Sequence, residues 1–208
     1  MEAEYKQTEI SKEIVSLSTK LFQQSGYKSF SYRDIAKEIG IKTSSIHYYF
    51  PSKDDLALII VKQYRKELAE ELNNISSKNS DPHSRLDLYM DLYINSFRQN
   101  KTVSFLSMLT MDLDNLPEII RKEVFIIIND SISWIQKTIE DGYSKKVFHF
   151  DQSPGSLAQT VFSALHGATI TSRSINDESA LLSTIESIKK MLATKDKGII
   201  SKYLSIGR

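Results

Sequence analysis

The stretch that most constrains the fold of this chain runs from residue 31 to residue 53, SYRDIAKEIGIKTSSIHYYFPSK. Ser31 and Asp34 have the spacing of a capping box, which predicts the start of a helix. Gly40 predicts its end, because glycine enters the left-handed backbone region without a Cβ clash. A second short helix is predicted from about Thr43 to Tyr49. The stretch therefore reads as two short helices joined by a tight turn.

Two short helices joined by a glycine-bearing turn are typical of a helix-turn-helix, whose second helix lies in the major groove of DNA. Ile46 and Phe50 would be buried against the first helix. The opposite face is polar and rich in hydroxyls, and it carries Lys42, Thr43, Ser44, Ser45, His47 and Tyr48. A helical hairpin inside an ordinary all-α domain would show the same local pattern, so the residues alone leave both interpretations open.

The residues that follow favour the DNA-binding interpretation. Ser52 and Asp55 form a second capping box, which starts another helix. The run IAKEIGIKTSSIHYYFPSKDDL resembles the DNA-binding domain of the TetR family of transcriptional regulators, over about the first quarter of the chain. Three residues depart from the family pattern: Lys42 where Ser is frequent, Ser44 where Gly or Pro is common, and His47 where Tyr is usual. These departures leave the operator sequence open.

Composition limits the alternatives. The 208 residues carry a net charge of only +1, so the overall charge does not indicate a nucleic-acid partner, and cysteine is absent. The N-terminal residues are acidic where a signal peptide is basic, and the apolar runs are far shorter than the ~20 residues that span a membrane. We therefore expect a soluble, cytoplasmic protein without a membrane partner. Four prolines and seven glycines indicate an almost entirely helical chain.

The predicted fold is all-α: an N-terminal three-helix helix-turn-helix domain followed by a larger helical ligand-binding and dimerisation domain. Residues 1–52 form the DNA-binding domain and residues 53–208 the second domain, whose helix 53–75 connects the two. Ser76 to Ser80 (SSKNS) is the predicted linker. Further helices are expected at about 8–25, 82–100, 102–112, 117–142 and 153–174, and from 177 onward.

The candidate DNA contacts are assigned by side-chain chemistry. Arg33 has the planar donor fork that suits guanine O6 and N7. The start of the recognition helix, which is expected to reach base edges, carries Lys42, Thr43 and Ser44. The groups expected at phosphates are Ser45, His47, Tyr48, Tyr49 and Lys53. Tyr49 is equally compatible with core packing beside Phe50. The family resemblance implies DNA contacts at these same positions.

A second candidate site lies in the larger domain. Amphipathic or apolar side chains on successive helices are suited to line an effector pocket, and they are Tyr93, Phe97, Met108, Met111, Trp134 and His166. The same residues would equally serve as ordinary core. The last two long helices carry small residues and a leucine–isoleucine stripe, and the resemblance implies that they form a homodimer interface. It also implies that a small molecule releases the protein from DNA.

No constellation of residues indicates catalysis. The chain lacks the usual hydrolase, nucleotide-binding and zinc-protease motifs, and its four histidines do not fall at metal-binding spacing on one helix face. We therefore expect neither an enzyme nor a cofactor or metal. The predicted function is a transcriptional repressor that binds a palindromic operator as a homodimer and is released by a small-molecule effector. The alternative is a helical ligand-binding or adaptor module of the same fold without sequence-specific DNA binding.

Overall fold

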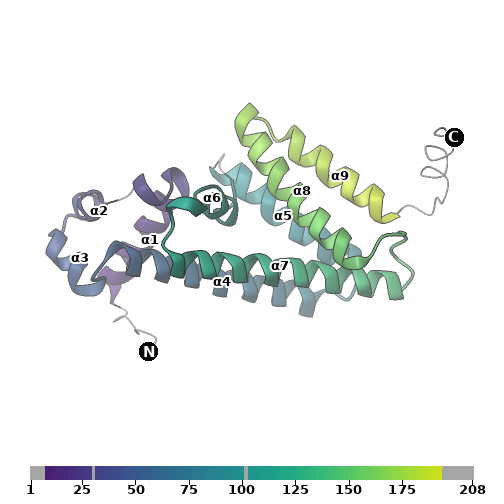
Figure 1. Cartoon of the computed structure of the whole chain (residues 1–208), viewed down its shortest axis with the longest axis horizontal. Coiled ribbons are helices and arrows are strands. Elements are labelled where there is room, and N and C mark those ends of the chain that lie inside the picture. Colours follow the sequence, from purple (N-terminus) through teal and green to yellow (C-terminus); the bar gives the residue numbers. More distant parts are fainter. Residues whose placement is uncertain (1–7, 30, 101–102, 194–208) are drawn as a thin grey trace. The chain divides into compact units, whose positions relative to one another are not determined.

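The computed structural model describes residues 8–29, 31–100 and 103–193, and within these ranges the chain is helical and contains no strand. The α-helices, labelled in Figure 1, are α1 (Glu9–Ser25), α2 (Tyr32–Ile39), α3 (Thr43–Tyr49), α4 (Lys53–Lys78), α5 (Pro82–Asn100), α6 (Phe105–Met111), α7 (Glu118–Ser144), α8 (Pro154–Ile175) and α9 (Ser179–Ala193). Two 3-10 turns lie at Tyr27–Ser29 and Leu113–Asn115. The all-α prediction is confirmed.

The helix ends follow from the capping residues. The Ser31 hydroxyl accepts a hydrogen bond from the Asp34 amide at the start of α2. Gly40 ends this helix in the left-handed conformation, with φ of 78°. At the start of α4 the capping box is complete, because the Ser52 amide donates to the Asp55 carboxylate and the Asp55 amide donates to the Ser52 hydroxyl. The predicted bounds of α2 and the predicted start of α4 are thus confirmed to within a residue.

The predicted linker at residues 76–80 is partly wrong, because α4 continues to Lys78. Serine and asparagine are weak helix formers, but tertiary contacts hold these last turns. Ile75 is buried, and its carbonyl accepts a hydrogen bond from the Asn79 side chain at 3.0 Å. The Trp134 indole donates to the Ser76 hydroxyl at 2.9 Å. The break falls just before Pro82 instead.

The chain divides into two compact units. Unit 1 contains residues 1–74 and 95–130, and unit 2 contains residues 75–94 and 131–208. Helices α4, α5 and α7 each contribute residues to both units. This division by compactness differs from the functional boundary predicted at residues 52 and 53, which stays a prediction.

Unit 1 is built around the apolar faces of α1, α2 and α3. The fully buried side chains at its centre are Ile14, Phe22, Ile35, Ile46, Phe50 and Leu56. Phe105 of α6 belongs to the same core, with its ring centroid 5.2 Å from that of Phe22 and 5.2 Å from that of Tyr64 on α4. The first three helices therefore share a core with α4 and α6, which fixes the positions of the helix-turn-helix residues.

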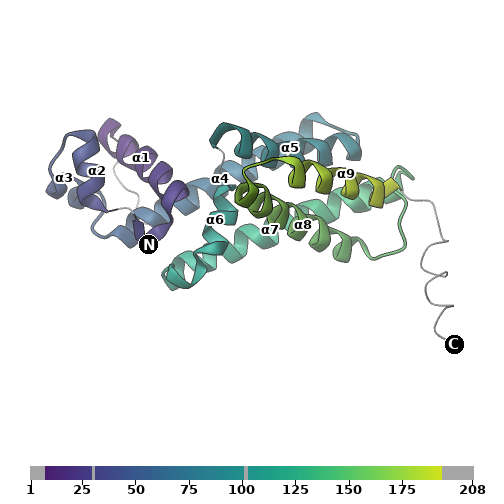
Figure 2. The same ribbon diagram turned by 90° about the horizontal axis from the view of Figure 1, so that it is seen from above.

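Unit 2 contains α8 and α9, which lie side by side in both Figure 1 and Figure 2. The buried stripe of α9 consists of Leu181, Ile185, Ile188 and Leu192. Near the end of α7, the Phe148 ring lies so close to Gly142 that a Cβ atom there would meet it at 2.0 Å. Only glycine fits this position. In the described ranges no helix is long and apolar enough to span a membrane.

Candidate DNA-binding surface

Helix α3 presents one face to the core of unit 1 and the other to solvent. Ile46 and Phe50 are fully buried. The exposed side chains are Lys42, Thr43, Ser44, His47 and Tyr48, and Ser45 and Tyr49 are half-buried. The structure therefore brings the predicted recognition residues together on a single outward surface. The two buried side chains fix the rotation of α3 about its own axis.

Tyr32 positions the end of α3, a role that the sequence analysis missed. Its buried hydroxyl is placed to donate to the carbonyls of Phe50, at 2.9 Å, and Ser52. Burial raises the pKa of Tyr32, and the nearby carboxylates of Asp55 and Asp54 raise it further. The hydroxyl therefore remains protonated at physiological pH and continues to donate. This residue ties α2 to the segment that joins α3 and α4.

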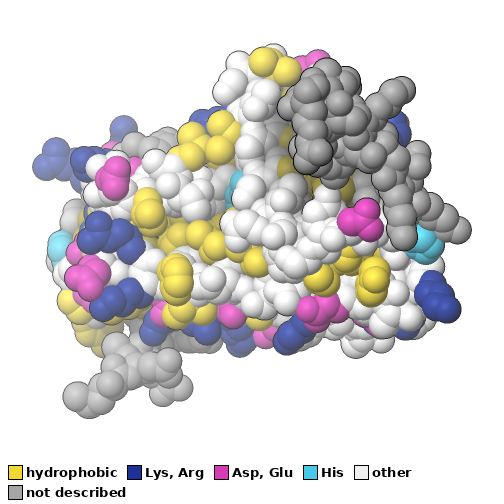
Figure 3. All heavy atoms as spheres, turned by 45° about the vertical axis from the view of Figure 1, so that its right-hand side comes forward, with side chains coloured by type: hydrophobic (Ala, Val, Ile, Leu, Met, Phe, Trp, Pro, Cys, Tyr) yellow, Lys and Arg dark blue, Asp and Glu magenta, His cyan; other side chains and the backbone are white. Residues whose placement is uncertain are grey.

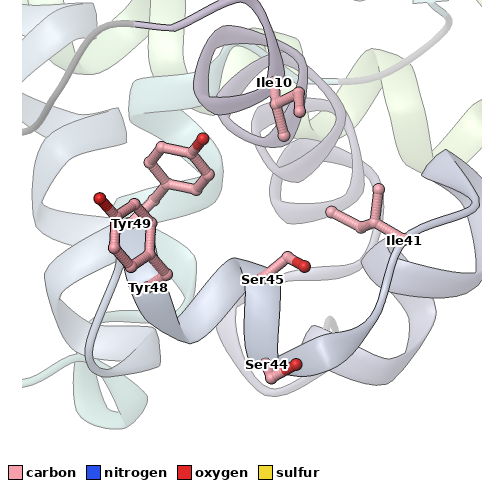
Figure 4. A pocket seen from close by; sticks show the side chains of 6 residues that line it. All are labelled: Ile10, Ile41, Ser44, Ser45, Tyr48 and Tyr49. Atoms are coloured by element: carbon pink, nitrogen blue, oxygen red, sulfur yellow. The ribbon is translucent and has the colours of Figure 1, made fainter.

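A shallow pocket of about 350 Å³ opens between α1 and α3. Figure 4 shows the Ile10 side chain extending from α1 and the other lining side chains on α3 or on the turn before it: Ile41, Ser44, Ser45, Tyr48 and Tyr49. Hydroxyl groups and apolar carbons both line it. Ile10 is exposed and was not predicted to be part of this surface. The Tyr48 and Tyr49 rings contact edge to face, with centroids 5.1 Å apart.

The predicted DNA contacts Arg33 and Lys53 lie in different surroundings. Arg33 lies in the first turn of α2 and is exposed. The Lys53 ammonium lies over the Tyr27 ring, 4.5 Å from its centroid, in a cation–π contact. Burial lowers the pKa of Lys53, while the carboxylates of Asp54 and Asp112 oppose this shift. Lys53 is therefore engaged within unit 1 as well as being near the surface.

His47 has one ring nitrogen committed to the protein. Its Nδ1 lies 3.1 Å from the Pro51 carbonyl oxygen. A carbonyl oxygen only accepts hydrogen bonds, so Nδ1 carries the hydrogen and, in the neutral ring, Nε2 is an acceptor. A phosphate oxygen also only accepts. His47 can therefore donate to a phosphate through Nε2 only when the ring is protonated.

The surface charge is mixed. On the face drawn in Figure 3, lysine and arginine side chains lie among aspartate and glutamate side chains. This pattern agrees with the net charge of +1. Selectivity for DNA would therefore depend on the individual side chains of α2 and α3 rather than on a large, uniformly positive surface.

Comparison with known proteins identifies this arrangement. Residues 14–59 match the family model described as bacterial regulatory proteins, tetR family. A TetR-family regulator from Agrobacterium tumefaciens has a crystal structure that superimposes with a TM-score of 0.84 and 25% identity, over 88% of this chain and 97% of that one. Residues 14–59 therefore form a DNA-binding domain of the tetR type, and the described chain has the fold of TetR-family regulators.

Further matches extend this assignment. A TetR regulator from Legionella pneumophila superimposes with a TM-score of 0.80 and 26% identity, over 89% of this chain and 98% of that one. YuxN of Bacillus subtilis, named an uncharacterized HTH-type transcriptional regulator, is 32% identical over 95 residues, which are 46% of this chain and 32% of YuxN. YxaF of the same organism is 22% identical over 88% of this chain and 94% of its own length.

A junction in unit 1 joins the helix-turn-helix region to α6. An oxygen of the Asp112 carboxylate, directly after α6, accepts a hydrogen bond from the Tyr27 amide at 2.5 Å. Its other oxygen accepts from the Asn115 side chain. Gly26 lies so close that an added Cβ atom would be 3.0 Å from the carboxylate. This contact joins residues 85 positions apart and was not predicted.

The predicted effector residues divide between the two units. Tyr93, Trp134 and His166 lie in unit 2, where aromatic and hydrogen-bonding contacts connect them through Tyr89. The other three lie in unit 1: Phe97 and Met108 are buried there, and Met111 is 53% exposed. No group of three or more potential metal ligands occurs among the residues that the structure describes.

The contact between Asp112 and the Tyr27 amide predicts faster hydrogen exchange near Tyr27 when the carboxylate is removed. Asp112→Ala leaves the Tyr27 amide without its acceptor, so the free energy of unfolding should fall by about 1–3 kcal/mol. Hydrogen exchange at residues 26–28 should accelerate. Asp114→Ala, at an exposed position two residues later, is the matched control and should change neither quantity. Equal exchange in the two variants would show that the contact does not hold this junction.

Proposed function

We propose that this chain is a cytoplasmic transcriptional repressor of the TetR type that binds a palindromic operator as a homodimer and leaves DNA when a small molecule binds. The proposal is supported most directly by the orientation of α3, which buries Ile46 and leaves Thr43, Ser44, His47 and Tyr48 exposed. A short helix presented in this way is suited to enter the major groove.

In the proposed complex, base and phosphate contacts are made by different side chains. Arg33, Lys42, Thr43 and Ser44 reach base edges, and Ser45, His47, Tyr48 and Tyr49 hold phosphates. Lys42 supports this role because it precedes α3 at the N-cap position but makes no side-chain capping bond. Lys53 contributes positive charge near the backbone, although its ammonium lies against Tyr27.

The dimer is proposed to form through α8 and α9. The outward face of α8 carries small residues, Ala164, Gly167 and Thr171. Gly167 is exposed, and a Cβ atom added to it would have no heavy atom within 4 Å. This face therefore leaves room for the close approach of another helix. Apolar side chains at the adjoining helix ends, Ile175 and Leu182, are also exposed.

Effector release requires that a ligand bind more tightly to a conformation with low affinity for DNA. Two features support such coupling. Helix α5 carries Tyr93 in unit 2 and, one turn further along, Phe97 in unit 1. Within unit 1, the Asp112–Tyr27 bond and the packing of Phe105 against Phe22 join α6 to the DNA-binding helices.

Selection from random duplex DNA tests the proposal. The full-length chain should enrich a palindrome whose half-sites are one helical turn or a multiple of it apart, because a two-fold dimer presents two copies of α3. Arg33→Ala should relax the preference at one position in each half-site, with a loss of about 1–3 kcal/mol.

Lys53→Ala is the comparison variant, because it should weaken binding to all sequences and reduce the salt slope by about one. If no sequence is enriched, the chain is instead a ligand-binding or adaptor module. If both variants lose affinity equally for the operator and for random DNA, the proposed division between base and phosphate contacts is wrong.

The dimer has a separate test in the outward face of α8. Gly167→Arg should convert the dimer to a monomer, measured by analytical ultracentrifugation at micromolar concentration, because a long charged side chain would be buried in the interface. Gln159→Arg introduces the same side chain at an exposed position on the flank of α8 and should leave the dimer intact. A wild-type chain that sediments as a monomer would overturn the proposed dimer.

A further inference from the structure

A continuous line of polar groups crosses the interior of unit 2. The Tyr89 and Tyr93 hydroxyl oxygens are 3.0 Å apart on α5, and the Tyr93 hydroxyl is 3.0 Å from Nε2 of His166 on α8. All three side chains are buried, with exposed fractions of 2%, 6% and 9%. Hydroxyl and imidazole groups are therefore held in sequence inside the unit and away from bulk water.

Aromatic rings surround this line, which we call the Tyr–Tyr–His cluster. The Trp134 ring stacks on Tyr89 with centroids 5.5 Å apart and an interplanar angle of 28°. The Phe162 ring lies 4.2 Å from that of His166. The Trp134 indole donates to Ser76, which fixes its orientation. A flat, unsaturated molecule would find ring faces and edges on several sides of the polar line.

His166 and Tyr89 are both uncharged at physiological pH. Burial lowers the pKa of His166 to about 4. Burial also raises the pKa of Tyr89 to about 12, partly offset by its hydrogen bond to Tyr93. A carboxylate or an ammonium group buried among these side chains would lose its hydration, which costs free energy.

We propose that the effector bound by unit 2 is an uncharged aromatic compound with a single hydroxyl group, of the phenol class. This inference rests on the proposed effector release and adds the chemical class of the ligand. The ligand hydroxyl enters the line between Tyr93 and His166, where it donates to Nε2 and accepts from the Tyr93 hydroxyl. Its ring replaces contacts that the aromatic side chains now make with one another.

The chain supplies its own reporter for this binding, because Trp134 is its only tryptophan and stacks within the cluster. The full-length protein is titrated with p-cresol, and tryptophan fluorescence is excited where p-cresol is transparent. Toluene, benzoate and benzyltrimethylammonium are the comparison probes, which remove the hydroxyl, add a negative charge and add a positive charge. We expect a saturable response to p-cresol about tenfold tighter than to toluene, and weaker responses to both ions.

Tyr93→Phe tests the hydrogen bond, because it deletes the hydroxyl and keeps the ring. Affinity for p-cresol should fall to about that of toluene, while affinity for toluene should stay unchanged. Tyr143→Phe removes an exposed hydroxyl elsewhere in unit 2 and should have no effect. Equal losses in both variants, a preference for either ion, or no saturable response to any probe would overturn the phenol assignment.

The same titration on operator-bound protein separates this inference from the proposed release. Binding of p-cresol that depends on Tyr93 but leaves the DNA complex intact would support the ligand class and contradict effector release. Release by benzoate or by the ammonium probe, without a response to p-cresol, would support effector release and overturn the ligand class.

Discussion

A helix of seven residues is too short to be stable in water by itself, so α3 depends on the burial of Ile46 and Phe50. These two side chains hold α3 against α1 and α2 and determine which of its residues face solvent. The Tyr32 hydroxyl reinforces this position through the carbonyls of Phe50 and Ser52. The proposed reading of DNA depends on this anchoring, because a rotation of α3 about its axis would turn its polar residues away from the groove.

The same core links the DNA-binding helices to more distant parts of the chain. Phe105 packs between Phe22 and Tyr64, and Asp112 accepts the Tyr27 amide hydrogen, so α6 belongs to the compact unit that contains α1 to α3. Unit 2, by contrast, holds a neutral polar cluster enclosed by aromatic rings. The long helices α4, α5 and α7 contribute residues to both units, so continuous helices connect the two units.

Local chemistry allowed much of unit 1 to be predicted from sequence, because capping residues and glycine act over a few positions. Ser31, Gly40 and Ser52 define helix ends without help from the rest of the chain, and α3 was predicted with its observed bounds. Contacts between distant residues could not be predicted in this way. Residue type made Phe97 and Trp134 candidates for the interior but did not identify their neighbours. The flexible Lys53 side chain lies over a ring 26 positions earlier in the chain. The helix continues through the serines after Ile75, where the Trp134 indole donates to the Ser76 hydroxyl.

In the proposed complex, α3 enters the major groove, and Arg33 of α2 helps to read the bases there. Methylation interference on the selected operator tests it most directly, because dimethyl sulfate modifies guanine N7 in the major groove, where a bidentate arginine would bind. We expect methylation of a guanine in each half-site to block binding by the full-length chain, and we expect this sensitivity to disappear in Arg33→Ala. Binding that tolerates methylation at every guanine of the operator would contradict it.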